Sequence, residues 1–417
     1  MSGYGFAVGS SGYDDEDRLV NWERPDTNLD QSWNLSAVGN WTCTTENSST
    51  QNRTHGPTYE MLTVWPPLPS EEVGLSGPGE GAVTHDAKGN MTLIPAVLRP
   101  TNSGLPPTAS RLSWDFENKL IAADTDNDIT DDIFYKFDAL GRRVGRNDGT
   151  ANVVYFQDGQ QTIADYPSGT AASSPTYTYV YASYIDEPAM RGGSGGLRYY
   201  HRNQQYSITA VSDGGGSVER YAYSAYGKVT VADASGTVIS SSAIANRYTY
   251  TGREWDEGLS LYHYRARMYD AVAGRFVSRD PIGYEGSEWN LYELGASSPL
   301  NQLDPSGMIS VFGFDPPMDL PPLPPIPWNP CIIAACGSCG AMLAATVYFA
   351  SEGCSDVSCV ITNLEVAYSM MPRYTKATIG LCVTGCGAVG CSLAPPGRIQ
   401  TGCAIGVALM GGIIAIN

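Results

Sequence analysis

The chain is poor in basic residues. Across its 417 residues, 25 Lys and Arg stand against 43 Asp and Glu, which gives a formal net charge of −18 at pH 7. A protein that holds nucleic acid through its phosphates needs a basic surface that displaces counterions. The composition therefore argues against this class of binding, and we expect no nucleic-acid partner.

The chain also lacks the motifs that mark the common enzyme classes. It contains no P-loop, no Gly-x-Ser-x-Gly elbow, no His-Glu-x-x-His sequence and no dinucleotide-binding fingerprint. Its few histidines are scattered through strand-like stretches, where stacking is a more natural role than catalysis. They are His55, His85, His201 and His263. We expect no cofactor.

A secretion signal is missing as well. The N-terminus, MSGYGFAVGSSGYDDED, carries neither a basic n-region nor an apolar h-region, so no Sec signal is visible. Either the protein is not exported by that route, or the chain is a piece whose upstream part is missing. We expect residues 1–24 to form a segment of low order.

Cysteine is nearly absent before residue 331, and nine of the ten cysteines lie between 331 and 417. The change coincides with the stretch DPPMDLPPLPPIPWNP at 315–330, which favours a stiff polyproline II spacer. We infer a Pro-rich linker over 309–330 and a separate Cys-rich C-terminal domain over 331–417. Only Cys336 and Cys339 have the tight spacing of a zinc knuckle, and the tail has no His, so we expect no metal site. Disulfides and buried free thiols both remain open.

Tyr, Gly and Pro are abundant instead. There are 26 Tyr against 9 Phe, with 46 Gly and 27 Pro, a mixture that favours many short strands joined by turns. The sequence LSAVGNWT at 35–42 recurs as HDAKGNMT at 85–92, and an acidic residue recurs in successive units. The recurring acidic residues are Asp86, Asp115, Asp138 and Asp158. Alternating apolar and polar residues between these turns predict β-hairpins.

The densest pattern lies between Asn246 and Met308. It combines Tyr-x-Tyr alternation with two Asp-Pro-x-Gly elements, DPIG at 280–283 and DPSG at 304–307. This segment resembles the repeat-associated core of the RHS/YD-repeat family, and residues 25–245 resemble the repeats that precede such a core. The chain is also similar to the C component of insecticidal Tc toxins. The resemblance implies a mainly β fold in which repeat hairpins form a sheet that winds into a shell, here a partial one. A small Cys/Gly/Ala-rich tail, helical in one interpretation, would follow the linker.

The resemblance also implies a self-cleaving core. On matching positions, Arg279 and Asp280 take the places of the family's functional Arg-Asp pair, and the scissile bond lies at or next to Met308-Ile309. An aspartyl-type mechanism needs a second carboxylate, for which Asp304 is the first candidate and Glu293 a substitute. The alternative is that Asp280 and Asp304 only stabilise turns, because Asp-Pro-x-Gly is a sound turn sequence by itself.

The tail contains three long stretches without charge, at 331–350, 377–397 and 401–417. Each approaches the length that crosses a bilayer, and small residues suit packed membrane helices. Bilayer contact, a compact Cys-rich domain and a broken remnant all remain open.

Two functions follow from the sequence. The first is the C-terminal part of a bacterial RHS-repeat polymorphic toxin, with a self-cleaving core, a membrane-active tail and an immunity protein as partner. The second is a non-enzymatic cell-surface scaffold that binds glycans or cells, with the tail as its anchor. Both imply a secreted or cell-surface location. Cleavage at Met308 separates them, because an anchored scaffold must stay whole.

Overall fold

The structure is a computed structural model that describes residues 12–24, 29–66, 81–99, 108–286 and 289–312. These residues belong to one compact unit, Met1–Met318. Within the described ranges the chain consists of antiparallel strands, with short 3-10 turns as its helical elements, so the mainly β prediction is confirmed. The expected tail over 331–417, its apolar stretches and most of the Pro-rich linker lie outside the described residues.

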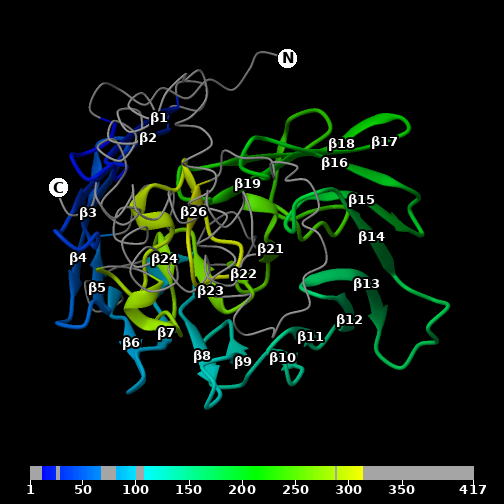
Figure 1. The fold of residues 1–417 in the computed structure, drawn as a ribbon, viewed down its shortest axis with the longest axis horizontal. Coiled ribbons are helices and arrows are strands. Elements are labelled where there is room, and N and C mark those ends of the chain that lie inside the picture. Colours follow the sequence, from blue (N-terminus) through cyan, green and yellow to red (C-terminus); the bar gives the residue numbers. More distant parts are fainter. Residues whose placement is uncertain (1–11, 25–28, 67–80, 100–107, 287–288, 313–417) are drawn as a thin grey trace, which may run out of the picture. The chain divides into compact units, whose positions relative to one another are not determined.

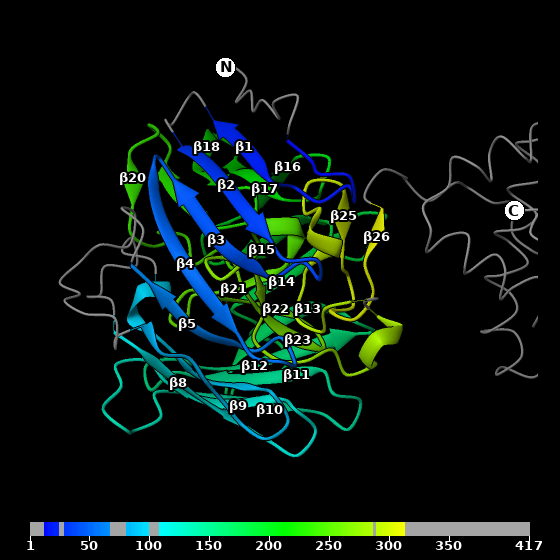
Figure 2. The same ribbon diagram turned by 90° about the vertical axis from the view of Figure 1, so that its left-hand side faces the viewer.

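The N-terminal hairpins form a separate sheet of five strands in the order β1-β2-β3-β4-β5, drawn in blue in Figure 2. Its strands are β1 (Asn21–Arg24), β2 (Leu29–Leu35), β3 (Trp41–Glu46), β4 (Ser49–His55) and β5 (Met61–Trp65). Each strand pairs with the next along the chain, as sequential hairpins should.

The main sheet has fifteen strands that follow chain order from β6 to β20 (Figure 1). It is open, with β6 and β20 at its two edges, which agrees with the partial sheet expected from the sequence. The strands are β6 (Thr84–His85), β7 (Met91–Ile94), β8 (Ser110–Trp114), β9 (Leu120–Asp124), β10 (Ile133–Phe137), β11 (Arg143–Asn147), β12 (Asn152–Asp158), β13 (Gln161–Pro167), β14 (Tyr177–Tyr181), β15 (Pro188–Gly193), β16 (Arg198–Arg202), β17 (Ile208–Asp213), β18 (Gly216–Tyr223), β19 (Val229–Asp233) and β20 (Val238–Ile239).

Many of the hairpins share one five-residue turn. Asp138 Oδ1 accepts hydrogen bonds from the backbone N–H groups of Leu140 (2.9 Å) and Arg142 (3.0 Å), and Gly141 adopts a φ of +72°. Asp86 and Asp115 make the same bonds to the residues two and four positions later. This geometry explains the recurring acidic residue, because the carboxylate satisfies two N–H groups of the tight turn.

The fourth residue of the predicted repeat differs. Asp158 forms the last ladder pair of the β12–β13 hairpin with Gln161, so no five-residue loop is left for its carboxylate to close. Asp213-Gly214 and Ala225-Tyr226-Gly227 lie at the turns that separate β17 from β18 and β18 from β19.

A third sheet occupies the centre of the fold. It contains β21 (Glu254–Asp256), β22 (Leu261–Tyr264), β23 (Arg267–Asp270) and β24 (Arg275–Phe276), and every residue of β22, β23 and β24 is buried. The side chains of one face pack into a cluster of tyrosines around Phe276, and those of the other join the main core. The Tyr-x-Tyr alternation thus forms a sheet buried on both faces.

Arginines fix this central sheet to its neighbours. Arg53 of β4 donates to the carbonyl oxygens of Ala273 (2.7 Å) and Val272 (3.1 Å), and Arg99 donates to that of Leu259. Carbonyl oxygens thus satisfy N–H groups of these buried arginines. The central sheet is therefore held from sequence positions far upstream.

Short elements complete the described chain. The two strands β25 (Gln302–Leu303) and β26 (Val311–Phe312) pair with each other. The 3-10 turns are η2 (Ala96–Leu98), η4 (Tyr250–Gly252), η5 (Gly283–Glu285) and η6 (Gly295–Ser297). None of the helical turns in the described ranges has the length or apolarity to span a membrane.

Candidate functional site

The two Asp-Pro-x-Gly elements are both turns, and they follow the central sheet. Asp280 comes four residues after β24, where its N–H donates to the carbonyl oxygen of Leu291 (2.9 Å) and its Oδ1 accepts from the N–H of Ile282 (3.0 Å). Gly283 closes this turn with a φ of +64°. The second element ends with Gly307 at a φ of +71°. Both elements are therefore turns, and the Asp280 carboxylate accepts a backbone N–H group within its own turn.

The fold brings the two carboxylates to one cation that the sequence did not single out. Arg267 Nη2 lies 3.0 Å from Asp280 Oδ2 and 3.3 Å from Asp304 Oδ2. The three side chains are almost inaccessible, with exposed fractions of 3% for Arg267, 0% for Asp280 and 1% for Asp304. Two buried carboxylates that share one guanidinium carry one uncompensated negative charge between them, which favours a proton on one of the two.

Arg267 also binds the peptide chain next to the second element. Its Nε donates to the carbonyl oxygen of Gly307, and its Nη1 donates to that of Leu291 (3.1 Å). The guanidinium lies over the ring of Phe276, 3.6 Å from the ring centroid. This one side chain thus contacts both carboxylates and both segments that present them.

The peptide bond between Met308 and Ile309 lies directly against these carboxylates. Asp304 Oδ1 accepts from the N–H of Met308 (3.0 Å) and from the N–H of Ile309 (3.2 Å). A methyl group on Gly286 would lie 2.2 Å from the carbonyl oxygen of Met308 and 2.6 Å from Asp280 Oδ2. Both oxygens therefore face the small space that the missing side chain of Gly286 leaves open.

The electrostatics of the site single out Asp280 as the group to carry the proton. Burial raises the pKa of the Asp280 carboxyl, the charge of Asp304 raises it further, and Arg267 offsets part of this. Asp280 Oδ2 accepts no well-directed hydrogen bond, although it is buried. A neutral Asp280 would instead donate from Oδ2 toward a carbonyl oxygen, and the one beside the Gly286 space belongs to Met308.

The DPSG turn packs against the β22–β23 hairpin, which donates hydrogen bonds to it. Arg265 donates to the carbonyl oxygen of Pro305, and the N–H of Ala266 donates to that of Ser306 (3.2 Å). A methyl group on Gly307 would lie 2.0 Å from the carbonyl oxygen of Tyr264. This close approach is open only to glycine, which explains its place in the element.

The other two residues proposed from the sequence lie elsewhere. Arg279 is turned away from Asp280 and pairs with Glu60, while its Nε donates to the hydroxyl of Tyr292 (3.2 Å). Glu293 Oε2 accepts from the hydroxyl of Ser297 (3.3 Å). The structure thus brings together Asp280, Asp304 and the 308–309 peptide, with Arg267 in the position of the cation.

The sequence carried little signal for Arg267 and Gly286. Arg267 belongs to the stretch RARMYD, whose two arginines the sequence does not distinguish. Gly286 follows the DPIG element as one more turn glycine. No spacing in the sequence marks Arg267 as the cation beside the two carboxylates or Gly286 as the glycine that leaves space beside Met308. Both roles depend on contacts between residues that are distant in the sequence.

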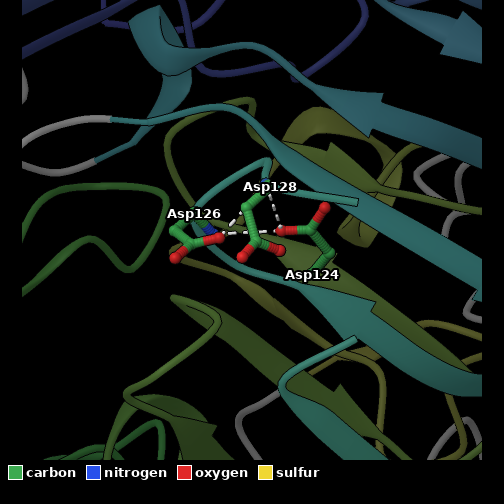
Figure 3. Close-up of side chains that lie close together, drawn as sticks. All are labelled: Asp124, Asp126 and Asp128. Carbon is green, nitrogen blue, oxygen red and sulfur yellow. Dashed lines mark hydrogen bonds between the residues drawn. The ribbon is translucent and has the colours of Figure 1, made fainter. Parts of the chain in front are cut away.

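A second group of carboxylates lies at the end of β9 and in the loop that follows it. One oxygen from each of Asp124, Asp126 and Asp128 falls within 4.8 Å of the others (Figure 3). Asp124 Oδ1 accepts from the N–H of Asn127 (2.6 Å), and its Oδ2 accepts from that of Ile129 (2.8 Å). The buried Asp124 is therefore occupied in closing its own loop, and the cluster is explained as a turn.

Comparisons of the sequence find relatives of mixed kind. The tRNA nuclease WapA of Bacillus subtilis is 32% identical over 199 residues, which are 47% of this chain and 8% of WapA. Salivary gland surface protein 1 of Aedes aegypti is 31% identical over 45% of this chain and 5% of its own length. The double-stranded DNA deaminase toxin A of Burkholderia cenocepacia is 24% identical over 49% of this chain and 16% of its own length. Bacterial toxins are among the relatives. No family profile matches the chain.

The matched region covers less than a tenth of the length of WapA. Among solved structures, the TcdB2-TccC3-TEV complex matches with a TM-score of 0.37 and 19% identity, over 71% of this chain and 18% of that chain. The Tc holotoxin pore of Photorhabdus luminescens matches with a TM-score of 0.37 and 18% identity, over 76% and 18%. The bacterial toxins among the sequence relatives are consistent with an RHS-type toxin, and the assignment of individual repeats stays a prediction.

Proposed function

We propose that this chain is a segment of an RHS-type toxin whose residues 246–308 cut the chain between Met308 and Ile309. The observation that carries the proposal is the placing of this peptide between two buried carboxylates. Asp280 Oδ2 and the Met308 carbonyl oxygen face one space, and Asp304 Oδ1 lies 3.2 Å from the nitrogen of Ile309. The similarity to WapA and to a deaminase toxin supports the toxin context.

The chemistry follows from the two positions. A neutral Asp280 donates a hydrogen bond to the carbonyl oxygen of Met308 and makes its carbon more electrophilic. Ionised Asp304 takes a proton from the attacking water, whose oxygen bonds to the carbonyl carbon. Asp304 then gives that proton to the nitrogen of Ile309 as the C–N bond breaks. The products are a carboxyl group on Met308 and an amine on Ile309.

The test begins with intact mass spectrometry of the 417-residue product. The wild-type chain should give two fragments that meet at Met308, and Asp280→Asn should give one full-length mass. Asp213→Asn is a matched control, since Asp213 closes the β17–β18 turn and has no contact with the site. A whole wild-type chain, or equal processing of wild type and Asp280→Asn, would contradict the proposal.

The released part would be the sequence after Met308. For it we propose bilayer contact through 331–350, 377–397 and 401–417, which leakage of dye-filled liposomes caused by the cleaved protein would support. The word tRNA in the names of the WapA relatives runs against our expectation of no nucleic-acid partner. That expectation rests on the net charge of −18 and stays a prediction. An immunity protein or a glycan as partner is likewise a prediction from sequence alone.

A further inference from the structure

The segment that carries Asp280 is held by turns from three other hairpins. This segment runs from Arg275 to Glu293, and its first and last residues form two arms that lie side by side. The N–H of Phe276 on the first arm donates to the carbonyl oxygen of Tyr292 on the second (2.8 Å). The N–H of Asp280 donates to the carbonyl oxygen of Leu291 (2.9 Å), which continues the same pairing. A restraint on one arm therefore restrains Asp280.

The first restraint comes from the turn between β4 and β5. Arg279 Nη2 pairs with Glu60, whose carboxylate also accepts from the hydroxyl of Thr58 at 2.6 Å and 2.8 Å. Glu60 is largely covered, with 13% of its side chain exposed, and Arg279 is half-covered at 31%. Burial alone would raise the pKa of Glu60, but the bonds from Thr58 and Arg279 lower it, so the carboxylate is ionised at neutral pH.

The second restraint comes from the turn between β6 and β7. The hydroxyl of Tyr292 donates to the carbonyl oxygen of Gly89 (2.8 Å), and it accepts from Arg279 Nε (3.2 Å). A methyl group on Gly89 would lie 2.4 Å from Arg279 Nε and 2.5 Å from the Tyr292 hydroxyl. Glycine at this turn thus permits both the φ of +85° and the contact with Arg279.

The third restraint comes from the turn between β2 and β3. Asn40 is 5% exposed, and its Oδ1 accepts from Asn290 Nδ2 (3.0 Å) and from Arg275 Nη2 (3.4 Å). The same Arg275 Nη2 donates to the carbonyl oxygen of Tyr59 (2.8 Å). The two Gly-Asn turns that recur in the sequence therefore both contact the segment that carries Asp280.

We propose that Arg279 is a positioning residue that couples self-cleavage to the docking of these hairpins. Arg279 does not touch the reacting peptide. Arg279 is the residue next to Asp280, and its ion pair with Glu60 anchors it to the N-terminal sheet. The site is then complete only when β4–β5 and β6–β7 have packed against the central sheet. The inference rests on the proposed function, because it gives cleavage a structural trigger.

The test is a charge reversal in the full-length chain. Cleavage is followed over time in cell-free translation by intact mass spectrometry, for Arg279→Glu, Glu60→Arg and the double variant. Each single reversal should slow cleavage by about ten- to a hundredfold, the cost of a misplaced reacting group, and the double reversal should restore most of the rate. A catalytic role at the reacting bond would leave the double variant as slow as Arg279→Glu, and this result would overturn the proposal.

The matched control is Arg142→Glu. Arg142 pairs with Asp138 at 2.7 Å with exposed fractions of 25% and 23%, in a turn that has no contact with the 275–293 segment. It should cleave at the wild-type rate. If Arg142→Glu slowed cleavage as much as Arg279→Glu does, any charge reversal would slow cleavage, and this result would contradict positioning by Arg279.

A second measurement separates this inference from the cleavage itself. In a chain that carries Asp280→Asn, hydrogen exchange of amides 277–286 should speed up with Glu60→Arg and return toward the starting rate when Arg279→Glu is added. If exchange follows this pattern but the wild-type chain is not cleaved, the contact between Arg279 and Glu60 positions the segment and the proposed cleavage is wrong. If neither charge reversal changes the hydrogen-exchange rate of amides 277–286, positioning by Arg279 is wrong, whatever the cleavage result.

Discussion

Gly286 is the residue at which the candidate site tolerates no side chain. Its backbone has a φ of −94° and a ψ of −22°, a conformation that alanine adopts freely. A methyl group there would nevertheless lie 2.2 Å from the carbonyl oxygen of Met308. The constraint at this position is thus one of space, not of backbone conformation.

Gly286→Ala should therefore stop cleavage while the protein stays folded. The methyl group would displace the Met308 carbonyl or Asp280 from the space that they share, and a shift of about 1 Å costs on the order of a hundredfold in rate. Intact mass gives the cleaved fraction, and thermal unfolding reports the fold. Gly214→Ala is the control, because a methyl at Gly214 meets nothing within 4 Å. Full cleavage of Gly286→Ala would contradict the assigned geometry.

Asp270 is a buried acid outside the site, and it makes stability depend on pH. Burial raises its pKa to about 6, although bonds from the N–H groups of Ala273 and Val272 (2.9 Å each) and the charges of Arg99 and Arg53 oppose this. Because the folded pKa lies above the unfolded value of 3.8, protonation favours the folded state. The stabilising effect is complete below about pH 4 and is lost as the pH rises through about 6.

Asp270→Asn should accordingly raise the free energy of unfolding at pH 7 by about 1–3 kcal/mol, since the amide keeps an oxygen acceptor without the buried charge. The gain should shrink toward zero as the pH falls to about 4, where Asp270 is neutral in the folded state and about half protonated in the unfolded state. Urea unfolding at the two pH values measures the difference. An equal change at both would show that packing rather than charge sets the effect.

At the scale of the element, the repeated five-residue turn combines an acidic acceptor with a residue of positive φ. Asp138 binds two backbone N–H groups of its turn and pairs with Arg142. The same arrangement starts at Asn203, whose Oδ1 accepts from the N–H groups of Gln205 and Ser207. An Asn can thus replace the acid, which shows that the acceptor rather than the charge forms the turn.

Asp138→Ala should lower the free energy of unfolding by about 1 kcal/mol, because two N–H groups lose their acceptor on a partly solvated turn. Asp138→Asn should cost less, since its amide oxygen still accepts. Asp158→Ala is the control, because Asp158 closes no such turn. Chemical unfolding followed by circular dichroism gives all three values. Equal losses in the three variants would contradict the assigned role of the acceptor.

At the scale of the whole described unit, a single turn residue joins two sheets. Tyr226 lies between β18 and β19, is 2% exposed, and makes edge contacts with Trp33 and Trp41 at ring-centroid distances of 5.0 Å and 4.5 Å. Its hydroxyl donates to the carbonyl oxygen of Ser297 (3.2 Å). The N-terminal sheet thereby packs against the main sheet through aromatic rings.

Tyr226→Ala should cost about 3–5 kcal/mol, as large aromatic deletions in a core do. It should also loosen the N-terminal sheet first, so that limited proteolysis cuts within residues 29–65 before the rest. Tyr199→Ala, at a side chain that is 42% exposed, is the control and should change little. Simultaneous exposure of all regions in Tyr226→Ala would show that the two sheets unfold as one.

The candidate site was predictable in part. The two Asp-Pro-x-Gly elements pointed to Asp280, Asp304 and the 308–309 peptide, and the fold brings these together. The cation was not predictable, because Arg279 and Arg267 both stand near the motif in the sequence. Which of them faces the carboxylates depends on the direction of each side chain from a buried strand or a turn. The roles of all these residues in cleavage stay predictions.

The sequence by itself determined the strands and turns of this protein. Alternation, turn glycines and acidic acceptors act over four or five residues, so local hydrogen bonding and allowed φ values suffice to set them. Tertiary structure alone decided the rest. It split the hairpins into a five-stranded and a fifteen-stranded sheet, and it placed Arg267 against two aspartates, the farther of them 37 positions along the chain. It also turned Arg279 toward Glu60. Such contacts depend on where distant backbones meet, which burial and packing of the whole unit determine.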